Sequence, residues 1–156
     1  MKTIQSLLVS AALAIGMAGP VHAGFGDPEV IIYRFPGVRA DGGPDHTGVA
    51  TVFHCTNFSG VSENVRIVIR DKDGNLFTNS QNGVLHLSTI SMSTKNTGAY
   101  SAVNMGTGAV NSGTAAIAAT SINVICTAVT IEASSAFPWG VALRGIRFNP
   151  VPGSQE

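Results

Sequence analysis

The sequence predicts an all-β protein, a single antiparallel β-sandwich of about seven to eight strands with one disulfide. Apolar residues downstream of the N-terminal segment recur with a period of two, as they do in half-buried strands. Gly, Asn, Asp and Pro separate these short runs at turn-like intervals. No segment of the same region carries an apolar stripe with helical spacing and capping residues, so helices are not expected.

Composition limits the classes of function that the chain can have. It has 156 residues, only 12% of them charged, and 9 Lys and Arg balance 9 Asp and Glu. A protein that binds nucleic acid by neutralising phosphates needs a clustered excess of Lys and Arg, so we expect no nucleic-acid partner. The surface must instead be made polar by Ser, Thr, Asn and Gly, a style that suits exported β-proteins.

Residues 1–23 have the pattern of a bacterial secretory signal peptide. A positive residue precedes an uncharged, mostly apolar run, and small residues follow at the cleavage site. The apolar run is shorter than the ~20 residues that a membrane-spanning helix needs. We therefore expect cleavage between Ala23 and Gly24. Residues 24–156 would then be a single exported domain, periplasmic or extracellular, with no stable membrane span after processing.

In the first half of the mature chain, the predicted strands are four runs rich in β-branched and aromatic residues: 30–35, 49–57, 65–70 and 84–91. A Gly- and Asp-rich loop is expected between the first two, over residues 37–48. The third run alternates most cleanly, which places its Val and Ile side chains toward the core and its Arg side chains toward solvent.

The segment 71–75 (DKDGN) is predicted to be a hairpin turn whose partner strand begins near Leu76. Its alternating oxygen-bearing side chains resemble the first ligands of a calcium loop. Position 82, where such a loop carries its bidentate Glu, is Asn, so the turn is favoured over the metal site. The Asn82-Gly83 dipeptide is expected to precede the next strand.

In the second half of the chain, four further extended segments are predicted: 100–103, 113–121, 122–133 and 140–148. Residues 93–121 consist mostly of Gly, Ala, Ser, Thr and Asn, which bury little apolar area. We interpret them as a pair of strands with small side chains, joined by long turns. The alternative is an adaptable binding loop. Residues 149–156 contain two Pro and are expected to form an extended, exposed tail.

The two cysteines, Cys55 and Cys126, are both predicted to lie on core-facing positions of strands. In an exported protein such a pair indicates an intramolecular disulfide, with two buried free thiols as the alternative. The spacing resembles that of the inter-sheet bridge of immunoglobulin domains. However, the single Trp follows the second Cys, and Val124 stands where a tyrosine corner would lie. We therefore expect an immunoglobulin-like sandwich only in a loose sense.

The sequence contains no recognised catalytic or cofactor-binding motif. No Ser lies in a G-x-S-x-G elbow, no H-E-x-x-H occurs, and the Gly pair at 106–108 does not open a helix. A metal site built from Asp45, His46 and one strand histidine, His54 or His86, has no supporting ligand spacing. We therefore assign no catalytic, cofactor-binding or metal-binding residues, and we expect no cofactor.

Three other polar positions receive structural interpretations. Glu63 and Glu132 are expected to be solvated charges at strand ends, since nothing in the sequence pairs them as a glycosidase would require. Asn57-Phe58-Ser59 matches the N-glycosylation pattern, which is short and common by chance and carries little weight in a bacterial protein.

The amphipathic aromatic residues are the remaining candidates for ligand contact. Tyr100 and Trp139 are the possible platforms, and Phe137-Pro138-Trp139-Gly140 has the composition of a loop that displays its Trp. The interpretation that we favour is that Trp139 covers one end of the core, because large aromatics dominate small cores.

The run from Thr51 to Ser59 (TVFHCTNFS), together with Asp73-Gly74, 119–121 (ATS) and 126–128 (CTA), resembles a group of small exported bacterial proteins with a Cys pair. The similarity covers most of the mature chain, and the shared features are paired cysteines, turns and strand starts. The resemblance implies export and a β-sandwich. It carries no activity or substrate.

These observations favour a non-enzymatic protein, a binding or structural module of the cell envelope or the extracellular space. Its expected partner is a protein or a glycan. A small envelope hydrolase with an unrecognised site and a carbohydrate-binding module that uses Trp139 and Tyr100 are the alternatives.

Overall fold

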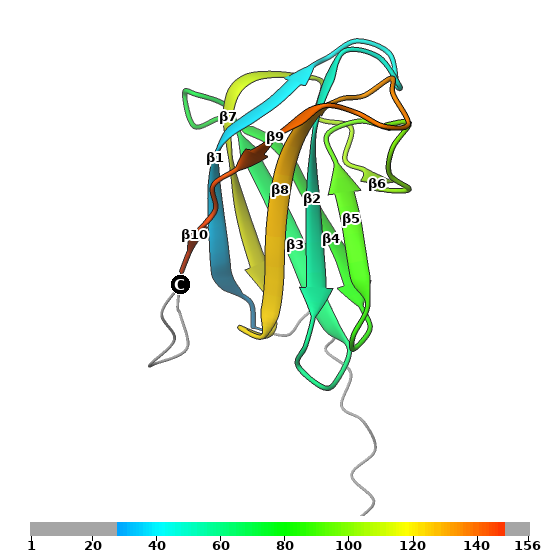
Figure 1. The fold of residues 1–156 in the computed structure, drawn as a ribbon. Coiled ribbons are helices and arrows are strands. Elements are labelled where there is room, and N and C mark those ends of the chain that lie inside the picture. The colour runs from blue at the N-terminus through cyan, green and yellow to red at the C-terminus, as the bar shows by residue number, and fades with distance from the viewer. Residues whose placement is uncertain (1–27, 149–156) are drawn as a thin grey trace, which may run out of the picture.

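The computed structural model describes residues 28–148, and these contain only β-strands and their connections (Figure 1). Ten strands form two sheets of five, so the expected β-sandwich is confirmed. The first sheet, sheet A, has the order β10 (Ile146–Arg147), β1 (Val30–Asp41), β7 (Ala109–Ala119), β3 (Glu63–Arg70), β4 (Leu76–Val84). The second, sheet B, has the order β6 (Val103–Asn104), β5 (Thr89–Ser93), β2 (Val49–Asn57), β8 (Val124–Glu132), β9 (Gly140–Leu143).

The expected signal peptide 1–23, its cleavage site between Ala23 and Gly24, and the tail 149–156 lie outside the described residues. Within residues 28–148, no helix has the length and apolar composition to span a membrane. The strand pairs within this range are antiparallel except β5 with β6, which run parallel.

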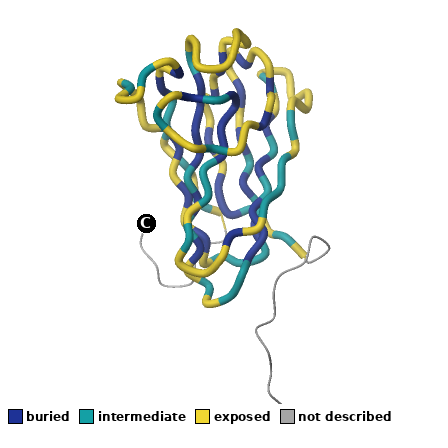
Figure 2. The backbone as a smooth tube through the Cα atoms, turned by 90° about the vertical axis from the view of Figure 1, so that its right-hand side faces the viewer, coloured by how far each residue is buried: buried dark blue, intermediate teal, exposed yellow. Residues whose placement is uncertain are grey.

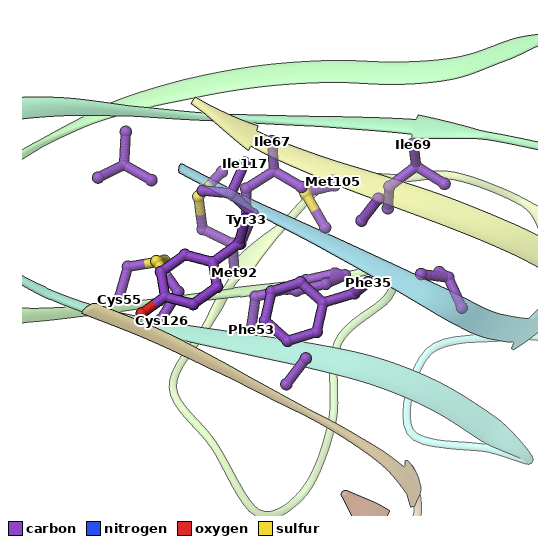
Figure 3. Packing of buried hydrophobic residues seen from close by; sticks show 14 of the residues in the cluster. Tyr33, Phe35, Phe53, Cys55, Ile67, Ile69, Met92, Met105, Ile117 and Cys126 are labelled. Carbon is purple, nitrogen blue, oxygen red and sulfur yellow. A yellow bond between two sulfur atoms is a disulfide. The ribbon is translucent and has the colours of Figure 1, made fainter. Parts of the chain in front are cut away.

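The hydrophobic core fills the space between the two sheets. Val65, Ile67 and Ile69 of β3 are fully buried, whereas the Arg residues between and after them face outward, as the alternation predicts. Phe35 of β1 and Phe53 of β2 meet edge to face across the sheets, with ring centroids 5.9 Å apart (Figure 3). Figure 2 shows that the buried residues follow the strands and that the exposed ones gather in the loops at the ends.

The disulfide between Cys55 and Cys126 is present, and it lies within one sheet. The two residues are directly opposite each other on β2 and β8, with Cα atoms 4.2 Å apart. Such close spacing is typical of a non-hydrogen-bonded antiparallel pair. Both side chains face the core, as expected, but the likeness to an inter-sheet immunoglobulin bridge is wrong. Alternation showed which face the cysteines occupy, but not which strands are neighbours.

The first strand is longer than predicted because it continues through Pro36-Gly37 to Asp41. Register shifts against β7 flank Val38, and Gly37 has a φ of +83°. A proline has no N–H to give to a ladder and is tolerated in a strand at such irregularities. The expected loop 37–48 is therefore shortened to the residues that follow Asp41.

The strand expected over residues 84–91 is also displaced. Asn82-Gly83 lies inside β4, where Asn82 pairs with Val65, and the chain turns at 85–88 instead. Leu87 takes a φ of +59° in this turn. The DKDGN segment does form the expected hairpin turn. Asp71 accepts hydrogen bonds from the backbone N–H groups of Asp73 and Asn75, both at 2.8 Å.

The C-terminal strand predicted over 140–148 is divided between the sheets. β9 pairs with β8 in sheet B, and β10 pairs with β1 in sheet A. The chain crosses between the sheets at Arg144-Gly145, along one lateral side of the sandwich (Figure 1). A Cβ on Gly145 would lie 2.5 Å from the Phe35 ring, so only glycine allows the chain to pass so close to the core.

Of the pair of strands expected over residues 93–121, β7 forms in full, and the part before it contains only the two-residue β6. β7 lies between β1 and β3, and Ala115, Ile117 and Ala119 alternate toward the core. The expected strand 113–121 begins four residues earlier, at Ala109. Arg66 on β3 is opposite Ala118, and the small side chain lets its guanidinium reach Glu29 at 2.6 Å.

Candidate functional site

A loop after β5 covers part of the outer face of sheet B. The chain leaves β5 at Ser93 and returns as β6 alongside the same strand. We call residues 95–102 the strap. Tyr100 lies in the strap, not in the short strand expected at 100–103, and its ring packs edge to face on His54, with ring centroids 4.7 Å apart. Sequence alternation could not indicate this contact, because it joins a strand to an irregular segment.

The strap closes over a second buried apolar group, separate from the main core. Register places Ala50 and Val52 of β2 and Ile131 of β8 on the outer face of sheet B, yet all three are buried. The Gly98 N–H donates to the carbonyl oxygen of Ala133 at 2.8 Å. A Cβ on Gly98 would lie 3.0 Å from the Ser134 carbonyl oxygen, so a larger residue here would need the backbone to shift by a few tenths of an ångström.

The β8–β9 loop, residues 133–139, lies beside the strap at one end of the sandwich, which we call the apex (Figure 1). The N–H of Glu132 donates to the carbonyl of Trp139 at 3.3 Å, and the N–H of Phe137 donates to the Ser135 hydroxyl at 3.0 Å. These bonds hold the loop while its aromatic side chains point to solvent. Phe137 is 92% exposed and Trp139 is 91% exposed.

The favoured interpretation, that Trp139 covers one end of the core, is therefore wrong. Gly140 pairs with Ile131, and a Cβ at Gly140 would come within 2.9 Å of Ile131 and Val129. The aliphatic residues of β8 therefore fill the space at Gly140, and the indole of Trp139, one residue earlier, lies in solvent. The less favoured interpretation, a displayed Trp at a loop tip, is the one that holds.

The strap and the β8–β9 loop together form an open hollow of about 440 Å³, which we call the apical hollow. Its lining residues come from these two segments: Ala99, Tyr100, Ala136, Phe137, Pro138 and Trp139. None of them carries a charge. The volume lies within the roughly 300–1,000 Å³ of small-molecule sites and the walls are mostly apolar, but the hollow is open to solvent and not enclosed. Tyr100 and Trp139 were recognisable from the sequence as ligand-contact candidates, Phe137 and Pro138 were named only as part of the loop that displays Trp139, and the two alanines were not singled out.

His54 makes the contact that most resembles catalytic machinery. Its Nδ1 lies 2.8 Å from the Ser91 hydroxyl, and burial lowers the pKa of the imidazole, which favours the neutral form. A serine hydrolase also needs a group that orients the base and donors that stabilise an oxyanion. In the described part of the chain, His54 has no hydrogen bond to a carboxylate. His54 and Ser91 are opposite each other on β2 and β5, so this contact joins two neighbouring strands of sheet B.

The other histidines lie apart from this pair. His46 lies in the β1–β2 loop at the apex, and His86 lies in the turn at the opposite end, where its Nδ1 accepts a hydrogen bond from Gly60. The Asp45 carboxylate accepts a hydrogen bond from the side-chain amide of Asn96 at 2.7 Å. No group of three or more metal-ligating side chains occurs in residues 28–148.

Two of the polar positions interpreted from sequence are buried. Glu63 was expected to be solvated, but its carboxylate is buried and accepts a hydrogen bond from the Thr120 hydroxyl. Glu132 is exposed, as expected. Asn57, the glycosylation candidate, is fully buried and donates to the carbonyl oxygens of Val61 and Val84 at 2.6 and 2.9 Å. Its amide nitrogen is therefore not accessible in the folded chain.

Lys95 connects the loops of the apex. Its side chain is almost completely buried, and its ammonium contacts the Asp41 carboxylate and donates to the carbonyl oxygens of Thr47, at 2.8 Å, and Pro44, at 3.3 Å. The hydrogen bond from Lys95 is the main cause that holds the pKa of Asp41 below its ordinary value. The β1–β2 loop is thereby fixed to the strap.

Replacing Lys95 by Met should lower the free energy of unfolding by about 1–3 kcal/mol at neutral pH, the cost of losing hydrogen bonds to a charged group. Because the pKa of Asp41 is lowered by folding, its contribution is present above the ordinary Asp pKa and is lost as the pH falls through the lowered value. The wild type should therefore lose more stability on acidification than Lys95→Met. Urea unfolding at pH 7 and near pH 3 measures this difference.

Asp45 and Asp71 provide the internal control for that comparison. Their pKa values are also lowered, mainly by hydrogen bonds from Asn96 and Asn75, and neither depends on Lys95 for its largest cause. Their acid sensitivity is common to both proteins and cancels in the difference. Equal losses of stability in the wild type and the variant would contradict the assigned role of the Lys95–Asp41 pair.

Comparison of the chain with protein-family models, with curated proteins and with solved structures gives no match.

Proposed function

We propose that this protein is an exported, non-enzymatic binding module and that it takes its ligand in the apical hollow. The observation that carries the proposal is the display of Phe137 and Trp139, each more than nine-tenths exposed, on a loop held by its own hydrogen bonds. Exposed apolar clusters of this kind mark interaction sites on soluble proteins. Loops on a rigid sandwich are also common positions for binding residues.

The ligand class that we propose is an uncharged saccharide chain. A sugar ring has an apolar C–H face and a rim of hydroxyl groups. In an open hollow walled by Tyr100, Pro138 and Trp139, the face packs on the aromatic surface and the hydroxyls stay in water. No polar group then has to be buried without a partner. The lack of charge in the lining favours neutral sugars over acidic ones.

The proposed location agrees with this ligand class. The expected signal peptide supports export to the periplasm or beyond, and the disulfide is consistent with an oxidising compartment. Polysaccharides of the cell envelope and of the surroundings are accessible there. The alternative proposal, a small envelope hydrolase, rests on the His54–Ser91 pair, which lies next to Tyr100. Release of new reducing ends from a bound saccharide would favour that alternative.

The chain provides its own probe for the test, because Trp139 is the single Trp and lies in the hollow. Titration with neutral oligosaccharides, such as β-glucan, mannan and chitin fragments, should shift the Trp emission to shorter wavelength and saturate. Phe137→Ala should weaken this binding by at least about tenfold, the loss of one central aromatic contact. Trp139→Ala should lose retention on an array of the same immobilised saccharides.

Phe58→Ala is the matched control, since Phe58 is a half-exposed aromatic at the end of the sandwich opposite the apex. It should bind as the wild type does. All three variants should keep the wild-type unfolding free energy within about 0.5 kcal/mol, as surface substitutions usually do. Equal loss of binding in Phe58→Ala, or no binding of any neutral saccharide by the wild type, would contradict the proposal.

A further inference from the structure

One edge of the sandwich differs from the other three. A sheet edge presents unpaired N–H and C=O groups, and natural proteins protect it by keeping the edge strand short or by placing Lys, Pro or a bulge there. The edge strands β6 and β10 have two residues each, and β9 has four. β4 has nine residues, and within residues 28–148 no strand pairs with its outer side.

The sequence of β4 has none of the usual protection. LFTNSQNGV contains no charged residue and no Pro, and its single register irregularity against β3 lies at the first residue pair, next to the turn. Hydrophobic residues are exposed at both of its ends. Leu76 and Phe77 are exposed at the start, and Leu85, directly after the strand, is 64% exposed. The residues between them are polar or small except Val84, which is buried in the core.

We propose that β4 pairs antiparallel with β4 of a second copy of this chain, with Ser80 on the two-fold axis. An isologous contact needs a surface that is complementary to itself. In this register Leu76 is opposite Val84 of the copy, and Phe77 is opposite Gly83. Thr78 is then opposite Asn82, and Asn79 is opposite Gln81. The central pairs therefore join polar residues and Phe77 is opposite a glycine, whereas Val84 is buried in its own core and adds no exposed apolar contact.

The absence of charge is what makes a second copy the favoured occupant. In a two-fold antiparallel pair, a charge near the centre would approach its own counterpart, which is destabilising. β4 avoids this at every position. The side-chain oxygens of Asn79 and Gln81 already accept hydrogen bonds from Arg66, and the Gln81 amide donates to Glu29, so the proposed pairing rests on the backbone ladder and not on these amides. The pairing would join the two copies of sheet A into one continuous sheet.

Sedimentation velocity of the exported protein over a range of concentrations should show a monomer–dimer equilibrium. Phe77→Lys, which replaces the exposed aromatic by a charge, should weaken the dimer by at least about tenfold. Trp139→Ala should dimerise as the wild type does, so failure of the saccharide proposal and failure of this one are distinguishable. A protein that stays monomeric at every concentration would overturn the proposal. So would a monomer whose β4 pairs with an unrelated peptide and not with a second copy.

Cysteine cross-linking tests the register. Ser80→Cys should form a covalent dimer on mild oxidation, whereas Ser112→Cys, an exposed position on the central strand β7, should not. Thr78→Cys mixed with Asn82→Cys should cross-link, and neither should do so alone. Circular dichroism shows whether each variant is folded. The two-fold axis at Ser80 would be overturned if Ser112→Cys cross-linked to the same extent as Ser80→Cys. It would also be overturned if the mixture of Thr78→Cys and Asn82→Cys gave no cross-linked dimer.

Discussion

Replacing both Cys55 and Cys126 by Ser should lower the free energy of unfolding by about 4 kcal/mol, the value of the chain-entropy model for a loop of this length. The bridge joins neighbouring strands that are already hydrogen-bonded, so it adds little to the order of the folded state. Its effect is on the unfolded chain, where it keeps the Gly- and Ala-rich segment between the cysteines within a closed loop. Urea denaturation of the variant and the wild type measures the change.

Reduction of the wild type with dithiothreitol in denaturant provides the control, since it opens the same loop without a substitution. Reduced wild type and the double Ser variant should have the same midpoint. Saccharide binding at the apical hollow should be unchanged under conditions where the variant is folded. A loss of stability below about 1 kcal/mol would show that the unfolded chain is already compact enough to make the loop closure unimportant.

Phe35→Ala should destabilise the protein by about 3–5 kcal/mol, the usual range for removing a buried aromatic side chain. The Phe35 ring is buried between the sheets, where it contacts Tyr33 and Phe53 at centroid distances of 5.8 and 5.9 Å. It also packs against the backbone at Gly145, where the chain crosses between the sheets. The cavity therefore weakens both the core and that crossing. Thermal and urea unfolding measure the effect.

Phe35→Leu and Phe137→Ala are the matched controls for that result. The first keeps an apolar side chain in the core and should cost less than Phe35→Ala. The second removes an exposed Phe and should leave the unfolding free energy within about 0.5 kcal/mol of the wild type. If Phe35→Ala costs no more than Phe137→Ala, the edge-to-face contact does not hold the sheets together.

Sequence alternation predicted the strands that have one buried and one solvated face. The Val and Ile residues of β3 are the clearest case. The prediction was wrong where a turn-forming pair occurs inside a strand. Asn82-Gly83 favours a hairpin turn locally, yet β4 continues through it because Val65 and Asn64 on β3 hold it in the ladder. Pro36-Gly37 in β1 is accommodated in the same way, by irregular pairing with β7.

The candidate site was predictable in part. Tyr100 and Trp139 stand out by residue type, and the structure brings both to one hollow. Its formation depends on contacts between segments far apart in sequence, namely the Gly98 hydrogen bond to Ala133 and the packing of Tyr100 on His54. Periodicity carries no information about such contacts. Trp139 itself was assigned to the core because residue size does not show whether the nearby space is already filled.

The crossing of the C-terminal segment back to β1 also determines how the molecule would sit on a support. Arg147 pairs with Tyr33, near the start of β1, so β1 begins and β10 ends well away from the apex (Figure 1). An attachment made directly at either end of the described range, residue 28 or residue 148, would leave the apical hollow facing the solution. Surface immobilisation, display and fusion to a reporter are therefore compatible with an unobstructed aromatic face.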